Sequence, residues 1–118
     1  MPKPDIVIRQ REQKPKEGEA IIPSVYGFID FHKIPRDKGG LLLFFNKDNE
    51  LLFVGKARKM RPRLKKHFED NVSPLKKYRE EVYKIEAFII DDAMEREIYE
   101  TYAINMLRAK YNLEKVFY

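Results

Sequence analysis

Residues 41–55 read LLLFFNKDNELLFVG and predict a β-hairpin. Two apolar runs, 41–46 and 50–55, flank the turn sequence Lys47-Asp48-Asn49, which is typical of a connection between antiparallel strands. Because nearly every residue of both runs is apolar, we expect both faces of these strands to be covered. Gly55 is expected to end the second strand.

The segment that follows the hairpin is strongly basic. Residues 56–66, KARKMRPRLKK, contain seven lysines and arginines and no acidic residue. A helix is expected to begin near Arg61-Pro62, because proline is tolerated in a first turn, and Leu64 and Phe68 would pack it against the sheet. Solvated helices usually mix charges, so an unmixed basic run favours a polyanion, with a merely solvated face as the alternative. The candidate DNA-binding residues are Lys56, Arg58, Lys59, Arg61, Lys65 and Lys66.

The second half of the chain predicts two further helices and a strand. Ser73-Pro74 is typical of a helix start, and residues 83–90 alternate as a third strand. Asp91-Asp92 is expected to cap a long helix over 93–111. The order β-β-α-α-β-α predicts an α+β fold with a small three-stranded sheet flanked by helices. The expected buried face of the long helix is Met94, Ile98, Tyr99, Tyr102, Ala103, Met106 and Leu107.

The N-terminal segment has a different composition from the rest. Residues 1–20 are rich in proline and lysine and predict a flexible tail, in which Ile6-Val7-Ile8 could pair with a sheet edge. Residues 21–118 are expected to form one domain, because a chain of 118 residues fits one compact core.

Composition excludes several classes of function. The chain has no cysteine, which rules out disulfides, zinc–thiolate centres and thiol nucleophiles. It has no apolar run near the roughly 20 residues that span a bilayer, and its N-terminus is too polar for a secretory signal. We therefore expect a cytoplasmic protein with no membrane partner. The net charge of +5 alone says little about nucleic acid.

Beyond residue 33, the chain resembles the GIY-YIG nuclease superfamily. Phe53-Val54-Gly55-Lys56-Ala57, followed by the basic helix, is similar to Tyr-Val-Gly-Lys-Ala in the N-terminal nuclease domain of the bacterial excinuclease that makes the incisions of excision repair. Residues 34–40 are similar to the lead-in of that nuclease domain, and Glu100 and Tyr111-Asn112 recur at the family's interval. The resemblance covers about residues 34–113. It implies a domain that binds DNA and hydrolyses phosphodiesters with Mg²⁺ or Mn²⁺, in DNA repair alongside a repair-protein partner.

The resemblance also implies a role for five side chains. Arg63 falls on the family's catalytic arginine, and His67 falls on a position that contacts the reacting phosphate. Glu100 falls on the metal-binding glutamate, and Asn112 on an asparagine that fixes the architecture of the site. Lys56 falls on a lysine that tunes a neighbouring tyrosine.

The residue types alone leave other interpretations open. Glu100 could form an ion pair with Arg96, and His67 could lie on the surface. Asn112 could be a helix C-cap residue. Glu97 is expected on the surface.

Both tyrosines of the family signature are absent. Leu42, after Gly40, and Phe53, before Gly55, stand at their positions, so neither phenolic hydroxyl is present. His67 is then the remaining titratable candidate for a general base, and its ordinary pKa of about 6.5 predicts a rate that rises through roughly pH 6–7. We therefore expect weak or altered hydrolysis. The alternative is a catalytically inactive DNA-binding or protein-interaction module on a degenerate nuclease fold.

Overall fold

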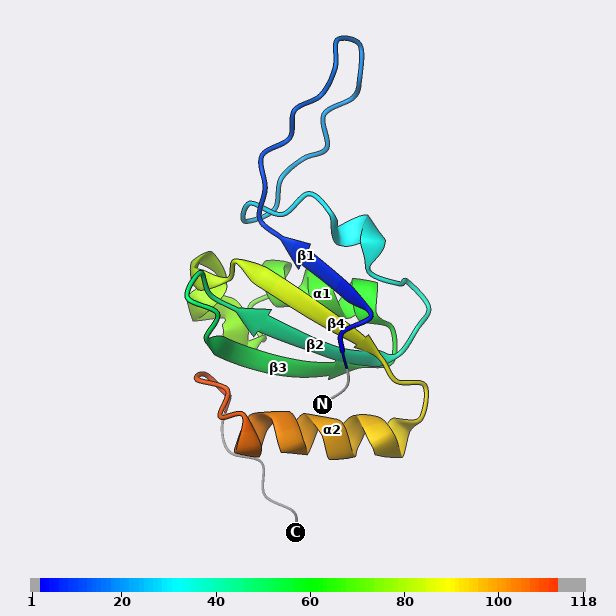
Figure 1. The fold of residues 1–118 in the computed structure, drawn as a ribbon, viewed down its shortest axis with the longest axis vertical. Coiled ribbons are helices and arrows are strands. Elements are labelled where there is room, and N and C mark those ends of the chain that lie inside the picture. The colour runs from blue at the N-terminus through cyan, green and yellow to red at the C-terminus, as the bar shows by residue number, and fades with distance from the viewer. Residues whose placement is uncertain (1–2, 113–118) are drawn as a thin grey trace.

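A four-stranded antiparallel sheet lies at the centre of the structure, a computed structural model that describes residues 3–112 (Figure 1). Its strands are β1 (Ile6–Arg9), β2 (Gly40–Phe45), β3 (Leu51–Ala57) and β4 (Lys84–Ile89), in the spatial order β1-β4-β2-β3. The predicted hairpin forms β2 and β3. Both of its strands are almost wholly buried, as the absence of polar alternation predicted.

Helices cover the two faces of the sheet. The basic helix α1 (Met60–Glu69) packs on one face through Leu64 and Phe68, followed by the 3-10 helix η2 (Pro74–Glu81). Ser73 caps η2 as predicted, because its Oγ accepts a hydrogen bond from the Leu75 N–H at 3.2 Å. The other face is covered by α2 (Ala93–Met106), which packs on β2 and β3. The fold class is therefore α+β.

The sheet has one strand more than the sequence predicted. β1 lies within residues 1–20, the segment expected to be a tail, and pairs with the outer edge of β4. Ile8 enters the core opposite Ile85, and the Asp5 carboxylate accepts a hydrogen bond from the Ile89 N–H. The apolar run at Ile6–Ile8 thus satisfies backbone groups that the edge of β4 would otherwise expose.

The excursion between β1 and the short 3-10 helix η1 (Phe31–Lys33) extends away from the sheet (Figure 1). Arg11 fixes its base through two hydrogen bonds to the buried Asp30 carboxylate, at 2.6 and 2.8 Å. The Arg11 guanidinium is the main reason that the pKa of Asp30 lies below its usual value. Further out, the Gln13 side chain bonds both backbone groups of Ile22.

Helix α2 begins as predicted but ends earlier. The Asp92 carboxylate caps it by accepting a hydrogen bond from the Glu95 N–H at 2.9 Å. The predicted end at residue 111 is wrong, because Arg108 adopts a left-handed conformation with φ of 54°. The chain then turns back, and the N–H groups of Lys110 and Tyr111 donate to the carbonyls of Leu51 and Leu52 in β3.

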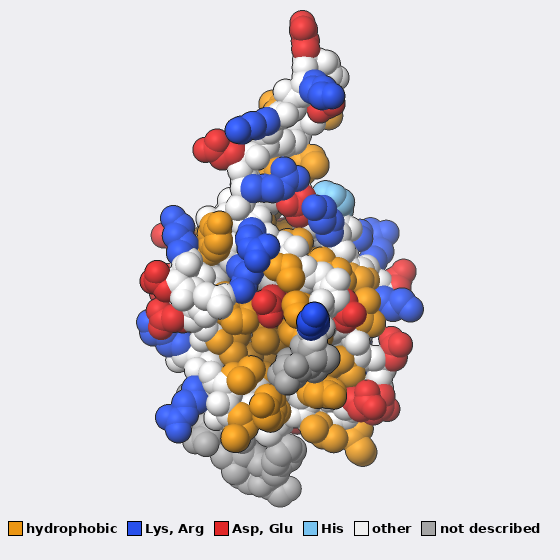
Figure 2. All heavy atoms as spheres, viewed as in Figure 1, with side chains coloured by type: hydrophobic (Ala, Val, Ile, Leu, Met, Phe, Trp, Pro, Cys, Tyr) orange, Lys and Arg blue, Asp and Glu red, His pale blue; other side chains and the backbone are white. Residues whose placement is uncertain are grey.

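The face of α2 that is buried also differs from the expected one. Ala103 and Ile104 are buried with the polar Glu100 and Thr101, whereas most of the predicted stripe is exposed. Ala103 and Ile104 pack there against large apolar side chains of the sheet such as Leu41. Hydrophobic side chains consequently gather on the surface over α2 (Figure 2). The exposed members of the predicted stripe are Met94, Ile98, Tyr102, Met106 and Leu107.

A cationic cleft as candidate active site

A cleft of about 790 Å³ opens between the end of β3, α1 and the inward side of α2. Its wall is strongly cationic and, among the described residues, contains Glu100 as its single carboxylate. A concave wall of one charge sign concentrates ions of the opposite sign, so the cleft suits a polyanion. The basic residues of the wall are Lys56, Arg58, Lys59, Arg63, Lys66 and Arg96.

Two sequence-predicted residues of opposite charge line this cleft from opposite sides of the sheet. Arg63 is an exposed residue near the start of α1. Glu100 is a buried residue of α2, only 8% exposed, on the helix face that contacts the sheet. The structure thus places a guanidinium and a carboxylate, 37 positions apart in the sequence, around one cavity.

Lys56 lies at the margin of the cleft in an ion pair. Its ammonium group bonds the carboxylate of Glu97, a residue expected from the sequence to lie at the surface. Both side chains are partly exposed, so the pair contributes little to stability. It does neutralise part of the positive charge that Lys56 brings to the end of β3.

Arg96 is a cleft residue whose contacts were not foreseen from the sequence. Its Nη1 donates to the carbonyls of Ile90 and Asp91, both at 2.9 Å, and so fixes the turn between β4 and α2. It lies against Gly39, where an added Cβ would be 2.3 Å from Nη1. The adjacent pair Gly39-Gly40 in the sequence was the available signal, since paired glycines often mark a close approach. A Cβ on Gly40 would lie 1.9 Å from the Phe88 carbonyl oxygen.

Asn112 is held at the outer edge of β3. Its Oδ1 accepts a hydrogen bond from the Val54 N–H at 2.6 Å, and its Nδ2 donates to the Val54 carbonyl at 3.0 Å. The side chain thus substitutes for a neighbouring strand and is not the helix C-cap that the sequence left open. This pairing fixes the turn after α2 to the strand that ends at the cleft.

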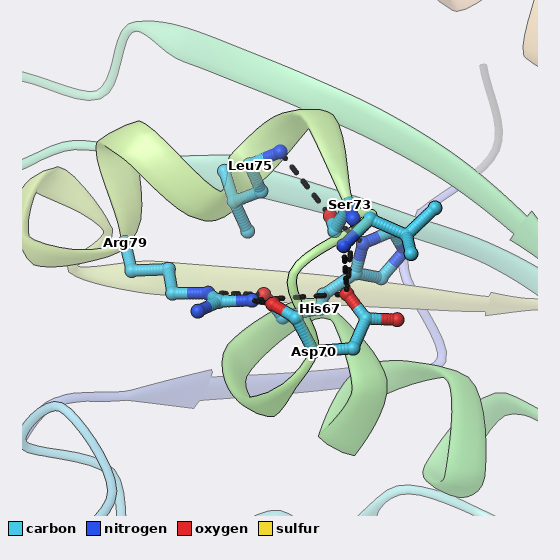
Figure 3. Close-up of polar contacts among 6 residues, drawn as sticks. His67, Asp70, Ser73, Leu75 and Arg79 are labelled. Carbon is cyan, nitrogen blue, oxygen red and sulfur yellow. Dashed lines mark hydrogen bonds and ion pairs between the residues drawn. The ribbon is translucent and has the colours of Figure 1, made fainter.

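His67 is a buried residue of the cleft wall, not a surface residue. It is 6% exposed and packs edge-on against the rings of Phe44 and Phe53. Its Nδ1 shares a hydrogen bond of 2.6 Å with Ser73 Oγ, as Figure 3 shows. Its Nε2 is buried and has no partner among the described residues, and an added Cβ on Gly55 would approach it to 2.9 Å. Gly55 is therefore needed for the close contact between β3 and α1.

The turn after His67 is fixed by a buried arginine (Figure 3). Arg79 Nε donates to the His67 carbonyl at 2.6 Å, and its guanidinium also bonds the Asp70 carbonyl. The Asp70 carboxylate accepts hydrogen bonds from the backbone N–H groups of Val72 and Ser73. These contacts fix the backbone after His67, while the ring itself is held by Ser73 Oγ and by the rings of Phe44 and Phe53.

Burial lowers the pKa of His67 from 6.5 to about 4, and the nearby Arg63 charge adds to the effect, while Asp70 opposes it. The imidazole is therefore neutral throughout the physiological range. The sequence-based expectation that His67 titrates through pH 6–7 is wrong for this environment. The physical reason is that the ring lies among Phe44, Phe53 and Gly55, where a charged form would lose its hydration.

This burial makes stability depend on pH. The unfolded chain takes up a proton on His67 near pH 6.5 and the folded chain only near pH 4, so stability is present above pH 6.5 and is lost as the pH falls. Between pH 7.5 and pH 5 we expect the free energy of unfolding to fall by about 2 kcal/mol from this residue. Urea unfolding at both pH values measures it. His67→Gln should remove most of this change in the free energy of unfolding, whereas His32→Gln, at an exposed position, should not. The same change in the wild type and both variants would contradict the assignment to His67.

Four predicted residues do not line the cleft: Gly40, Leu42, Arg61 and Lys65. Arg61, a predicted DNA contact, instead donates from Nε to the Ile34 carbonyl at 2.8 Å and from Nη2 to the His32 carbonyl at 2.7 Å, fixing the loop before β2. Lys65 is exposed on α1 outside the cleft wall. Leu42 is fully buried in the core, opposite Gly55 in the β2–β3 register. Arg61 is therefore a structural residue.

Comparison with known proteins places the chain in a family. A UvrC-like GIY-YIG domain matches residues 38–113. The uncharacterized protein YurQ of Bacillus subtilis (strain 168) is 59% identical over 118 residues, covering 100% of this chain and 95% of YurQ. UvrABC system protein C of Mycoplasma capricolum is 35% identical over 79 residues, 65% of this chain. The chain spans only 13% of that relative's length.

Solved structures share the fold. The GIY-YIG N-terminal endonuclease domain of UvrC from Thermotoga maritima, bound to magnesium as its catalytic divalent cation, superposes with a TM-score of 0.62 at 24% identity. The match covers 71% of this chain and 97% of that domain. A point mutant of the same domain with a tyrosine replaced by phenylalanine, also bound to its divalent cation, matches at 25% identity. The chain belongs to the UvrC-like GIY-YIG domain family.

Proposed function

We propose that this nuclease-like domain binds duplex DNA in its cationic cleft and hydrolyses a phosphodiester bond with the help of a divalent cation. The observation that carries the proposal is that Arg63 and Glu100 line the same cleft among five other cations. The guanidinium of Arg63 is suited to bind two non-bridging phosphate oxygens at once. Lys59 and Lys66 would contact flanking phosphates.

Glu100 would hold the cation. No three His, Asp or Glu side chains group together within residues 3–112, so an all-protein metal site is not available there. Mg²⁺ fits nevertheless, because it retains most of its waters and needs only one or two carboxylates. When bound, Mg²⁺ or Mn²⁺ lowers the pKa of a coordinated water and offsets phosphate charge. The cation-bound Thermotoga domains include mutants with phenylalanine in place of a tyrosine, which supports metal binding without a full set of hydroxyls.

The remaining residues position the reacting groups in this proposal. His67 is neutral and its Nε2 is enclosed behind Gly55, so we assign it a positioning role for Phe53 and the end of β3. Asn112 keeps β3 in place through Val54. Because Phe53 and Leu42 offer no hydroxyl to a water or a leaving group, we expect slow cutting.

The cellular part of the proposal rests on relatives. UvrABC system protein C belongs by name to the UvrABC system. A role in DNA repair, a repair-protein partner and a cytoplasmic location are proposed for this chain on that basis. No helix in the described part of the chain is long and apolar enough to cross a membrane.

A second candidate function has a specific observation in its favour. Leu42 is wholly buried and Phe53 is 5% exposed, so both signature positions retain their packing while lacking the hydroxyls. A non-catalytic DNA-binding module would show this pattern. Both functions require DNA in the cleft, and only the first requires cutting.

DNA binding in the cleft predicts a steep salt dependence. Each phosphate contact that releases counterions contributes a slope of about −0.9 to the logarithm of affinity against the logarithm of salt concentration. We expect Lys59→Ala and Lys66→Ala each to reduce the slope by about 1. Fluorescence anisotropy with labelled duplex DNA measures the affinity and its salt dependence, with EDTA present to prevent cutting. Lys65→Ala on the same helix is the matched control and should change neither affinity nor slope. A slope near zero would exclude this cleft as the DNA site.

A further inference from the structure

Helix α2 carries a line of exposed apolar side chains along its outer side, which we call the α2 stripe. Its members are Met94, Ile98, Tyr102 and Met106, with 71%, 56%, 42% and 69% of their surfaces exposed. Their spacing of four places them on one side of a helix. Single exposed apolar residues are ordinary, but a contiguous row indicates an interaction surface. The surface view shows hydrophobic side chains over this helix (Figure 2).

The α2 stripe faces away from the cleft. The residues through which α2 lines the cleft include Arg96, Glu100 and Ile104, each two positions after a member of the stripe. Two positions correspond to about 200° around a helix, so the two rows lie on nearly opposite sides. An occupant of the stripe would therefore leave the cleft open.

The pattern of the stripe is complementary to itself in the antiparallel direction. With a two-fold axis midway between Ile98 and Tyr102, Ile98 faces Tyr102 of a second copy and Met94 faces Met106 of that copy. The same surface then serves both molecules, as in most homodimers. A parallel arrangement would instead place each residue against its own equivalent.

Charges at the two ends of α2 favour the same arrangement. Asp91, Asp92 and Glu95 surround its start, whereas Arg108 and Lys110 follow its end. Antiparallel pairing brings the acidic start of one helix beside the basic residues that follow the other. The two helix dipoles are then antiparallel, so that each positive end lies near the partner's negative end.

We propose that the chain forms a reversible antiparallel homodimer through the α2 stripe, with its two clefts open to solvent. The inference does not depend on the proposed function. A helix of 14 residues is about 21 Å long, which gives a smaller contact than the roughly 800 Å² per partner of a standard interface. The dimer should therefore dissociate in the micromolar range.

Sedimentation velocity over about 1 to 300 µM protein tests the dimer. We expect the wild-type chain to shift from monomer to dimer across this range. Ile98→Glu should remain monomeric, with an unchanged circular dichroism spectrum because the side chain is exposed. Val72→Glu, at a position 86% exposed and remote from α2, is the control and should dimerise normally. A monomer at every concentration, or a dimer that Ile98→Glu does not affect, would overturn the proposal.

Disulfide cross-linking tests the antiparallel arrangement, because the chain contains no cysteine of its own. We expect a mixture of Met94→Cys and Met106→Cys chains to form a covalent dimer on mild oxidation. Each variant alone should cross-link at least tenfold more slowly. Efficient cross-linking of either variant with itself would indicate a parallel or unrelated contact and reject the arrangement.

Discussion

Arg63→Ala is expected to lower the rate of metal-dependent plasmid nicking by about 10²–10³-fold, the usual loss when one preorganised group that stabilises the transition state is removed. Arg63 lines the cleft opposite Glu100, and no other guanidinium in the described wall comes from α1. The pentavalent phosphorane carries more charge than the ground-state diester, so the loss should appear in the cutting rate more than in DNA affinity. Conversion of supercoiled to nicked plasmid with Mg²⁺ or Mn²⁺ measures it.

Lys65→Ala is the matched control for this experiment. It lies two positions further along the same helix, is exposed and does not line the cleft, so it should cut at the wild-type rate. Glu100→Gln should abolish the metal-dependent part of the activity while duplex binding in EDTA persists. Wild-type cutting that survives Arg63→Ala would show that the chemistry occurs elsewhere. If the wild type shows no metal-dependent nicking, the remaining function is that of a non-catalytic DNA-binding module.

The sequence predicted the central part of the fold well because its signals were local. The apolar hairpin, the proline at the start of α1 and the caps at Ser73 and Asp92 each act within a few residues. The fourth strand was harder to predict, since β1 is short and forms only because β4 offers an edge more than 70 positions away. The buried side of α2 was predicted only in part, because Ala103 of the predicted stripe is buried but Ile104 was not expected there. Apolar residues lie on both sides of this helix, and the sheet beneath determines which side is covered.

The candidate site shows the same division. Family spacing identified the positions of Arg63, Glu100 and Asn112, and the structure brings all three to one cleft. The sequence could not reveal that Arg61 donates hydrogen bonds to backbone carbonyls, because seven basic residues among eleven do not indicate which one turns inward. Nor could composition show the enclosure of His67, which results from rings contributed by β2 and β3. Long-range packing therefore decides which basic or titratable residue is available for chemistry.

Phe53→Tyr is expected to raise the rate of cutting, because it returns a phenol to a ring that already lines the cleft. General acid–base help is typically worth about 10²–10⁴-fold. A free phenol has a pKa of about 10 and needs a nearby cation to act as a base at neutral pH. Lys56, three positions further along β3, could supply that charge, but Glu97 partly neutralises it. We therefore expect a gain of only about tenfold from Phe53→Tyr alone.

Removing the ion pair between Lys56 and Glu97 should raise the cutting rate further. In Phe53→Tyr/Glu97→Gln the ammonium keeps its full charge and lowers the pKa of the new phenol, so the rate should rise by about 10²-fold over the wild type and reach its plateau at lower pH. Glu97→Gln without the phenol should have little effect on the pH profile. Phe45→Tyr, which adds a phenol on β2 outside the cleft, is the control and should cut like the wild type. If the double variant binds DNA and metal but cuts no faster than the wild type, the missing hydroxyl at residue 53 does not limit the reaction.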